Sequence, residues 1–543
     1  MSGGDCVSAA GRNVGLETTS NSSTPRDSRP SASATYAFLL LLAAGAVLRF
    51  TYLERRPLHG DEAGGAAISS EVGDSGSFVY ALPNSHGPFQ YFLGGGVMRL
   101  AGESTFWIRF PYALVGSLLP LACLGLRRPL GDTAWLLACS LLTFSPTFLY
   151  YSRYAIQEVD FAVATAALLS FGAWFARSGR TGALVGTCLA AAWMVTVKET
   201  FVIVWACLAM ALGMGALLGG QRFRDRLMDV LRYLVSRWRS LALGASLGGV
   251  VVLGAYSDCF RDATGLRNLA QNMAQMLRTG GSSASTVELH RHPPGFYAGL
   301  VLRYEWLVAV LSVAGAWAAL RTRRPMLVFL TLYAALVTGV HCALTYKTPW
   351  LLITPLLPLA LLAGAGGAAL LGVFAVTRGA RFQVAAAALL PLLSLPDAIR
   401  SSFLHPADPS EGLAYHHAGP EQEQLALEIH AIISRVPDDV SPKVVICLPH
   451  VWPLAWYLRD EPDVAYQGAA APQLAADDLR GLPALVTLER ADPRFVRAFL
   501  HTDTVPPFEI PGYKSRRVVL IPPDYMVARL WVRPDLASAD LTR

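Results

Sequence analysis

Long apolar runs separated by short polar loops fill the first four hundred residues of this chain. The runs are close to the length of about 20 residues that an α-helix needs to cross the hydrocarbon core of a bilayer. The pattern predicts about eleven membrane-spanning helices, at residues 35–53, 107–126, 133–150, 159–176, 183–198, 200–219, 241–256, 299–320, 326–344, 350–375 and 383–396. We therefore expect a polytopic α-helical membrane protein, with a membrane domain over residues 35–398.

The pattern changes at both ends of the predicted membrane domain. Beyond it, short β-rich runs bounded by turn residues predict strands at residues 444–448, 484–489, 517–521 and 528–533. Helical periodicity predicts two helices in the same region, at residues 421–436 and 453–460. Residues 399–543 are therefore expected to form a small α/β domain. Residues 1–34 are rich in Ser, Thr and Gly and lack the layout of a signal peptide, so we expect a disordered tail.

The distribution of charge predicts the orientation of the helices. Only 15% of the residues are charged, far fewer than in an average soluble protein. Arginines recur in the tail and in the loops near residues 127, 177, 221, 321 and 378, which share one side if the helices alternate. Because basic loops face the cytoplasm, we expect a cell-membrane protein with a cytoplasmic N-terminus and an extracytoplasmic C-terminal domain. The net charge of +6 then reflects topology and attraction to anionic lipid, not nucleic-acid binding.

Unusual polar residues gather on the predicted outer face. The first outer loop, residues 54–106, begins with HGDEAGG, and its adjacent carboxylates Asp61 and Glu62 are costly to keep near lipid. The rest of that loop is apolar enough to form amphipathic helices along the membrane surface. The other outer loops contain YYSRYAIQEVD, VKET, HRHPPGFY and TYKTPW, which bring charged and aromatic residues to the same boundary. We expect a cavity there for an amphiphilic ligand.

Each of these features also has a structural interpretation. An Asp-Glu pair after a helix can simply cap the next helix. Arg153 with Glu158, and Lys198 with Glu199, could be structural ion pairs, and the aromatics of YKTPW lie where aromatic belts form. The histidines of the outer loops are too scattered to indicate a zinc site.

The eight cysteines contain no CxxC pair. Five of them lie in apolar runs, where buried structural thiols are expected. Cys259 and Cys447 could meet outside the membrane as a disulfide, although the sequence alone does not fix cysteine pairing.

The order of these motifs resembles the glycosyltransferase-C superfamily, which uses polyprenyl-phosphate sugars and includes protein O-mannosyltransferases and ArnT-like aminoarabinose transferases. The resemblance lies in the Asp-Glu pair, the downstream HGP, and the RxPxALxGSLLPL segment at Arg109–Leu121. The segments SRYAIQE, VKET, YKTPW and WPLAWYLRD (Trp452–Asp460) are similar to a branch of predicted membrane mannosyltransferases called flippase-activity-associated proteins. The resemblance covers nearly the whole chain except the tail.

The resemblance implies a glycosyltransferase-C fold and an enzyme that moves a sugar, such as mannose or another hexose, from a polyprenyl-phosphate carrier to an acceptor on the outer face. It implies Asp61 as the catalytic acid near the acceptor, where it would act as general base. Glu62 or Glu158 would hold the acceptor or a divalent cation, with Asp160 as the second choice for Glu158. If a cation is used, Mg²⁺, Mn²⁺ or Ca²⁺ is expected, with Asp61 and Glu158 as ligands; the sequence leaves the metal dependence open.

Cations and aromatic rings would bind the donor. Lys347 and Arg153, together with Lys198, would neutralise the departing lipid phosphate. The aromatic residues would stack on the sugar or shape the lipid entrance. The full set of predicted substrate-binding residues is His59, His86, Phe89, Arg153, Lys198, Glu199, Tyr346, Lys347 and Trp350. The acceptor, whether glycan, lipid or protein, is not identified by the sequence.

Two other functions remain open at this point. A non-catalytic flippase-associated protein that handles lipid-linked sugars would need the same cations but not the base at Asp61. A small-solute transporter is the third alternative. Transporters often contain inverted repeats and matching Gly- or Pro-broken helices, and neither feature is recognisable in this sequence.

Overall fold

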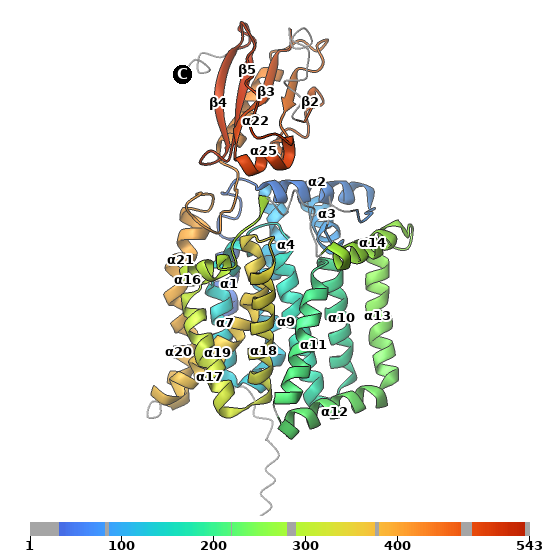
Figure 1. Ribbon diagram of the computed structural model, residues 1–543, viewed down its shortest axis with the longest axis vertical. Coiled ribbons are helices and arrows are strands. Elements are labelled where there is room, and N and C mark those ends of the chain that lie inside the picture. The colour runs from blue at the N-terminus through green and yellow to red at the C-terminus, as the bar shows by residue number, and fades with distance from the viewer. Residues whose placement is uncertain are drawn as a thin grey trace, which may run out of the picture.

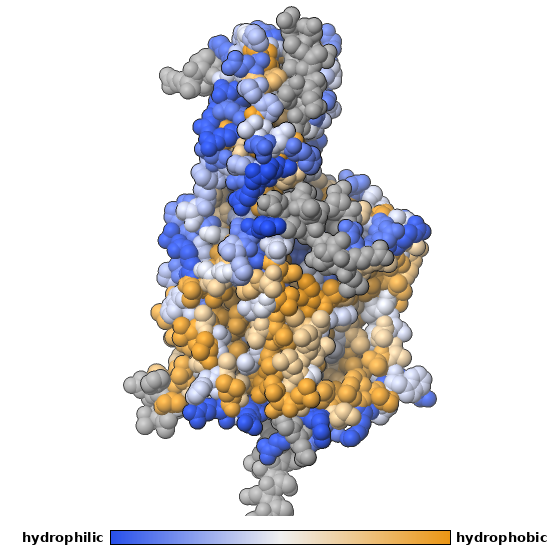
Figure 2. Space-filling model, viewed as in Figure 1, coloured by the Kyte–Doolittle hydropathy of each residue, from blue (hydrophilic) through white to orange (hydrophobic). Residues whose placement is uncertain are grey.

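The computed structural model describes residues 32–81, 86–218, 220–279, 289–374, 379–468 and 481–537. It consists of a helical bundle with a smaller sheet domain standing on one end (Figure 1). The bundle carries a broad apolar belt between two hydrophilic ends (Figure 2). Within the described residues, eight helices are long and apolar enough to cross a bilayer, so the chain is a multi-span membrane protein.

Each of the eleven predicted spans is helical, but not all are single straight helices. The main bundle helices are α1 (Ala32–Phe50), α4 (Thr105–Ser117), α7 (Asp132–Phe144), α8 (Pro146–Ser152), α9 (Glu158–Ser178), α10 (Thr181–Val197), α11 (Phe201–Leu218), α13 (Trp238–Tyr256), α16 (Phe296–Tyr304), α17 (Trp306–Thr322), α18 (Pro325–Ala343), α19 (Ile353–Phe374) and α20 (Gly379–Leu389). Among the described helices, α7 with α8 and α16 with α17 form bent pairs, at 56° and 103°, which raises the number of candidate spans to ten. The remaining predicted span is α10, a shorter apolar helix of 17 residues.

Short helical segments extend several of these spans. They are α5 (Leu119–Ala122), η1 (Leu124–Leu126) and α6 (Arg127–Leu130) after α4, η2 (Pro349–Leu352) before α19, and η3 (Leu390–Ser394), α21 (Leu395–Ile399) and η4 (Arg400–Leu404) after α20. The tail predicted for residues 1–34 lies outside the described residues except for its last three, which already belong to α1.

The two bent pairs meet at their breaks. Ser145 and Pro146 interrupt the helix between α7 and α8, and the Ser145 hydroxyl caps α8 by accepting from the Phe148 amide. Glu305 occupies the break between α16 and α17, and its carboxylate accepts hydrogen bonds from Ser145 Oγ at 2.6 Å and Thr147 N at 3.0 Å. One carboxylate therefore satisfies donors freed by the neighbouring break.

Three helices lie at the end of the bundle that carries the sheet domain, which we call the site end. They are α2 (Gly60–Ser75), α3 (Phe89–Ala101) and α14 (Thr264–Thr279). The first two occupy most of the predicted loop 54–106, and α2 runs across the top of the bundle (Figure 1). The arginine-rich α12 (Gly220–Ser236) lies at the opposite end.

The sheet domain contains five described strands, β1 (Val444–Cys447), β2 (Val464–Tyr466), β3 (Ala484–Ala491), β4 (Lys514–Ile521) and β5 (Met526–Val532), in the order β2-β1-β3-β5-β4. The pairs that include β1 are parallel, and β5 pairs antiparallel with β3 and β4. The helices are α22 (Glu421–Ile433), α23 (Leu454–Tyr457) and α25 (Pro493–Leu500). All four predicted strands and both predicted helices are present, whereas β2 and α25 were not expected.

The cysteine pair considered from the sequence does not form a disulfide. Cys259 is exposed and Cys447 is buried in β1, and both are free thiols. Cys447 packs inside the sheet domain beside Val445 and Trp531, so its sulfur is not available to a surface loop.

Candidate active site

The start of α2 is fixed by the buried carboxylate of Glu62. Arg109 donates to both of its oxygens, from Nε at 2.7 Å and from Nη2 at 2.8 Å. The backbone amides of His59 and Ala155 add bonds at 3.0 and 2.9 Å. Burial alone would raise the pKa of Glu62, but the charges of Arg109 and Arg56 outweigh it and hold the pKa well below its ordinary value. Glu62 is therefore a fully engaged, ionised anchor.

Arg109 extends this anchor to the segment that leads into α2. Its guanidinium is completely buried and also donates to the carbonyl oxygens of Leu53, Arg56 and Pro57 at 2.8 to 3.0 Å. Arg109 belongs to the RxPxALxGSLLPL segment and is a site residue that was not predicted from the sequence. The available signal was an arginine inside an apolar span, where charges are expensive and usually structural or functional.

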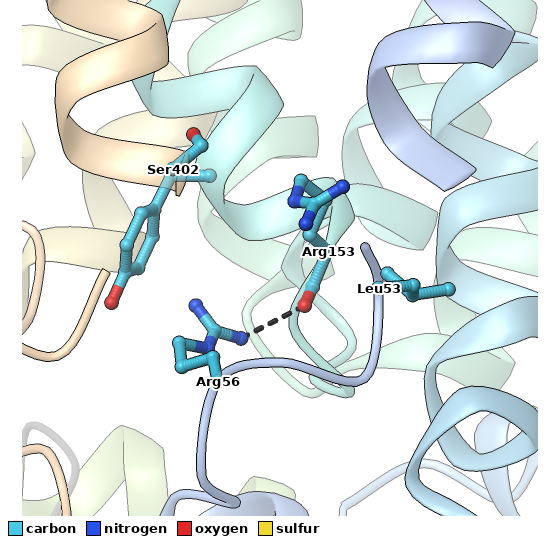
Figure 3. Close-up of a pocket in the computed structure, with 5 residues that line it drawn as sticks. Leu53, Arg56, Arg153 and Ser402 are labelled. Atoms are coloured by element: carbon cyan, nitrogen blue, oxygen red, sulfur yellow. Dashed lines mark hydrogen bonds between the residues drawn. The ribbon is translucent and has the colours of Figure 1, made fainter. Parts of the chain in front are cut away.

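Arg56, which belongs to this segment, and Arg153 line the same small cavity. Arg56 Nη2 donates to the Arg153 carbonyl oxygen at 2.8 Å, and a cavity of about 10 Å³ lies between them and Leu53 and Ser402 (Figure 3). The guanidinium of Arg153 donates at 2.6 to 3.0 Å to four carbonyl oxygens at the end of α1, those of Leu48, Arg49, Thr51 and Tyr52. Arg153 thus caps α1, a use of its donors that differs from the predicted binding of phosphate.

Asp61 has surroundings opposite to those of Glu62. Its side chain is 54% exposed, and among the described residues no lysine or arginine forms an ion pair with it. Its backbone amide donates to His59 Nδ1 at 3.0 Å, so this nitrogen is an acceptor and the imidazole proton is assigned to Nε2. The position at the amino end of α2 favours a negative charge through the helix dipole. Asp61 is therefore an oriented and accessible carboxylate.

Aromatic rings from distant segments surround His59. Its ring centroid lies 5.3 Å from that of Tyr154, 5.6 Å from that of His417 and 6.1 Å from that of Trp350. Tyr154 follows α8, Trp350 lies in η2, and His417 precedes α22, so three parts of the chain converge on the start of α2. We call this group of rings and Asp61 the chamber.

The loop after α18 forms another wall of the chamber. Its Lys347 amide donates to the His290 carbonyl oxygen at 3.0 Å, and the rings of Tyr346 and His290 lie 5.0 Å apart. The Tyr415 hydroxyl lies 3.1 Å from His290 Nδ1 and 3.0 Å from His292 Nε2. Two histidines and a tyrosine are therefore linked by hydrogen bonds at this wall.

Burial keeps His290 and the neighbouring His416 neutral. It lowers the pKa of His290 to about 4, partly offset by the nearby Asp61 carboxylate, and it lowers the pKa of His416 to about 2. The pKa of Tyr346 is raised by burial first and then by the carboxylates of Asp61 and Glu158. Tyr346 thus lies near two of the three predicted catalytic acids, Asp61 and Glu158.

The charged residues after α10 pair differently from the expected pattern. Lys198 Nζ lies 2.5 Å from Glu158 Oε1, and both side chains are buried, so neither the Arg153–Glu158 pair nor the Lys198–Glu199 pair forms. Glu199 instead accepts from the Tyr80 hydroxyl at 2.9 Å and lies 3.5 Å from His86 Nδ1. Burial alone would raise the pKa of Glu199, but the hydrogen bond and charge of His86 outweigh this effect, and the pKa lies below its ordinary value.

The remaining predicted residues occupy the edges of this region. Phe89 begins α3, and its ring lies 5.4 Å from that of Trp193 in α10. Lys347 is buried, and its Nζ donates to the carbonyl oxygens of His292, at 3.1 Å, and Leu344. Asp160, the second choice for Glu158, is fully buried in α9, and neither carboxylate oxygen has a hydrogen-bond partner.

The donor set does not fit a bound divalent cation. Across the described ranges, no group of three or more His, Cys, Asp or Glu side chains is arranged to hold a metal. Lys198 occupies one oxygen of Glu158, and its ammonium would repel a second cation at that carboxylate.

Comparison with known proteins supports the resemblance given by the motifs. Residues 85–240 match the family of dolichyl-phosphate-mannose-protein mannosyltransferases. No curated protein sequence matches the chain.

Solved structures give the overall fold. ArnT from Cupriavidus metallidurans in its apo state is 17% identical to this chain, with a TM-score of 0.59. The match covers 93% of this chain and 100% of the ArnT chain. The same protein bound to undecaprenyl phosphate is 16% identical with a TM-score of 0.58, and 94% of this chain and 100% of that chain are covered. The chain therefore has the glycosyltransferase-C fold seen in ArnT, with its Asp-Glu pair at the start of α2.

Proposed function

We propose that this chain transfers a sugar from a polyprenyl-phosphate carrier to an acceptor at the site end. The observation that carries the proposal is the contrast at the start of α2. Glu62 forms a buried ion pair with Arg109. Its neighbour Asp61 is oriented and half-exposed, and it forms no ion pair with a lysine or arginine among the described residues. The family match and the ArnT structure bound to undecaprenyl phosphate support a lipid-phosphate donor.

In the proposed reaction, an acceptor hydroxyl oxygen attacks the anomeric carbon of the donor sugar. The bond from that carbon to the phosphate oxygen breaks, and polyprenyl phosphate leaves with the electron pair. Asp61 takes the hydroxyl proton as the new bond forms, which is the role of a general base. A single displacement of this kind inverts the configuration of the anomeric carbon. An amine acceptor would react in the same way.

Two lysines are proposed to stabilise the leaving phosphate. Negative charge grows on its oxygens in the transition state, and preorganised cations stabilise it most where water is excluded. Lys347 uses two of its three N–H groups on carbonyl oxygens, which leaves the third for the phosphate. Lys198 is held beside Glu158 at the same end of the bundle. Arg153 is left out of this set because its donors cap α1.

The remaining parts of the proposal concern position and sugar binding. Tyr346 and Trp350 lie in the chamber wall and are proposed to contact the sugar. The distribution of arginines supports an extracytoplasmic site end in the cell membrane, with α12 on the cytoplasmic side.

The first test is transfer of radiolabelled mannose or glucose from polyprenyl phosphate in membranes, with native lysate as acceptor. The wild type is expected to move label off the lipid, and Asp61→Asn is expected to abolish transfer while donor binding and thermal stability are kept. Asp439→Asn, an exposed change of the same kind in the sheet domain, is the matched control and should transfer at the wild-type rate.

Full transfer by Asp61→Asn would overturn the assignment of the base. If the wild type binds the donor and moves it across the membrane but never transfers the sugar, the flippase-associated alternative replaces the proposal.

A further inference from the structure

Four arginines lie buried near the start of α2. They are Arg49, Arg56, Arg109 and Arg153, and each is at most 7% exposed. Among the described residues, Glu62 is the only carboxylate that forms an ion pair with any of them, to Arg109 at 2.7 Å and to Arg56 at 3.5 Å. The group therefore holds four positive charges and one negative charge. Buried charges are normally paired, so this surplus needs an explanation.

Contacts between the arginines join them into one group, which we call the arginine cluster. Arg109 Nη1 donates to the Arg56 carbonyl oxygen at 2.8 Å, and Arg56 Nη2 donates to the Arg153 carbonyl oxygen at 2.8 Å. Arg153 Nη1 in turn donates to the Arg49 carbonyl oxygen at 3.0 Å. Burial first, and then the charges of the three other arginines, lower the pKa of Arg153 to about 9. Arg153 is still charged at neutral pH, and its neighbours oppose that charge.

A small cavity lies within the arginine cluster. Arg56 and Arg153 line it together with Leu53, Tyr150 and Ser402, and its volume is about 10 Å³ (Figure 3). A volume of this size holds one particle about as large as a water molecule. A sulfate, a phosphate or a lipid headgroup is larger and would not fit.

Two polar atoms of the lining residues lack a hydrogen-bond partner. Arg56 Nε and Ser402 Oγ are both buried, and neither has a partner among the described residues. The Tyr150 hydroxyl is already engaged, since it donates to the Pro406 carbonyl oxygen at 2.7 Å. An arginine N–H can only donate, and a serine hydroxyl can also donate. The lining therefore offers hydrogen-bond donors, and a matching occupant is an acceptor.

Charge distinguishes between the particles that fit this volume. A water molecule can accept from both donors, but it leaves the surplus of positive charge in place. A cation would be repelled by the guanidinium groups of Arg56 and Arg153. A monatomic anion accepts from both donors and also offsets one of the buried positive charges.

We propose that this cavity binds one halide ion, such as chloride. The donors of Arg56 and Ser402 and the charge of Arg153 hold the ion. It serves as a counter-charge for the arginine cluster and thereby stabilises the segment between α1 and α2, because Arg153 and Arg109 bind carbonyl oxygens of that segment. The proposal concerns a site separate from sugar transfer and does not depend on that activity.

Binding is tested by thermal unfolding of the purified full-length chain in lipid nanodiscs. Chloride replaces gluconate, an anion too large for the cavity, at constant ionic strength, so that the screening of surface charges does not change. The wild-type unfolding midpoint is expected to rise with the chloride concentration, because a ligand of the folded state stabilises that state. Bromide should act in the same way, and its anomalous scattering in crystals should place it beside Arg56 and Ser402.

Two variants of Ser402 separate this site from other effects of salt. Ser402→Ala removes one hydrogen bond to a charged ligand, which should raise the chloride concentration needed for a given shift about tenfold or more. Ser402→Asp supplies a fixed negative charge at the cavity and should make the midpoint independent of chloride. Ser410→Asp introduces the same charge at an exposed position and should keep the wild-type dependence on chloride.

A wild-type midpoint that does not change with chloride would show that the cavity holds only water and would overturn the proposal. A chloride dependence that both Ser402 variants leave unchanged would overturn it as well, because the halide would then bind elsewhere. If Ser402→Asp does not fold, the shift in Ser402→Ala and the position of bromide decide the question. Asp61→Asn should lose transfer but keep the chloride dependence, so the halide site and the proposed enzyme activity can fail separately.

Discussion

Two carboxylates that are neighbours in the chain have opposite surroundings because an α-helix turns successive residues by about 100°. Glu62 points into the bundle, where Arg109 meets it, and Asp61 points towards the chamber. The ion pair of Glu62 fixes the first turn of α2 and therefore the backbone of Asp61. In its proposed role as the base, Asp61 would need little reorganisation when it takes a proton, because its backbone is held in place.

At the same scale, the neutral histidines of the chamber predict how stability depends on pH. The pKa of His290 is lowered to about 4, so between its ordinary value and about 4 the unfolded chain binds a proton that the folded chain does not. Stability should therefore be highest above about pH 6.5 and fall as the pH falls towards 4. Thermal unfolding in detergent is expected to show a lower midpoint at about pH 5 than at about pH 7.

The contribution of this histidine is isolated by His290→Asn, whose unfolding midpoint should fall less over the same pH range. His501→Asn changes an exposed histidine and should keep the wild-type pH dependence. An equal fall in His290→Asn and the wild type would contradict the assignment of the effect to His290.

At the scale of the element, α2 depends on Glu62 for its start. His59 and Glu62 form a reciprocal capping box. The His59 side chain accepts from the backbone amide of Glu62, and the Glu62 carboxylate accepts from the backbone amide of His59. Glu62→Gln would leave Arg109 buried without its counter-charge, which typically costs about 3–5 kcal/mol. We expect a clearly lower unfolding midpoint and a loss of transfer. Asp61→Asn should instead lose transfer alone.

Glu71→Gln is the control for this stability measurement, because it makes the same chemical change on the exposed face of the same helix. Its unfolding midpoint should match that of the wild type. A Glu62→Gln protein with wild-type stability would show that the buried pair does not hold α2 in place.

Long elements were predictable from the sequence because their signals are local. A run of apolar residues marks each span, so the bundle helices lie where they were expected. The strand β2 has only three residues, too few to show an alternating pattern. Helix α25 is amphipathic, but its eight residues make only about two turns, so its signal in the sequence is short. The bend at Glu305 was also not expected, because its hydrogen-bond partners lie about 160 positions away.

The candidate site was predictable only in part, for the same reason. The Asp-Glu pair stands out beside an apolar run, but the difference between Asp61 and Glu62 depends on Arg109, 47 positions further along the chain. Lys198 could have paired with the adjacent Glu199, and only the packing of α9 against α10 brings Glu158 to it. Arg153 likewise has no local signal that it caps α1.

At the scale of the whole molecule, one tryptophan joins the sheet domain to the bundle. Trp456 is 3% exposed and packs with Leu58, Ala63 and Ile108 of the bundle side. Trp456→Ala is expected to cost about 3–5 kcal/mol, the usual range for a buried aromatic residue. The sheet domain should then be cut faster by protease than in the wild type, and transfer should fall.

Trp317→Ala is the control for this loss, because Trp317 is 57% exposed on the lipid-facing side of α17. It should leave the proteolysis pattern unchanged. Wild-type protease resistance in Trp456→Ala would show that other contacts hold the sheet domain.

The position of WPLAWYLRD has a consequence for the biosynthesis of the protein. The Tyr457 hydroxyl accepts from the Leu58 amide at 3.0 Å, so the first loop is completed by a residue made almost four hundred positions later. Domains form in order during synthesis, from the N-terminus onwards. A nascent chain that ends before this segment has all of α2 but lacks the contacts of Trp456 and Tyr457 with the first loop. The contacts that tie the first loop to the sheet domain therefore form last, after every described bundle helix has been made.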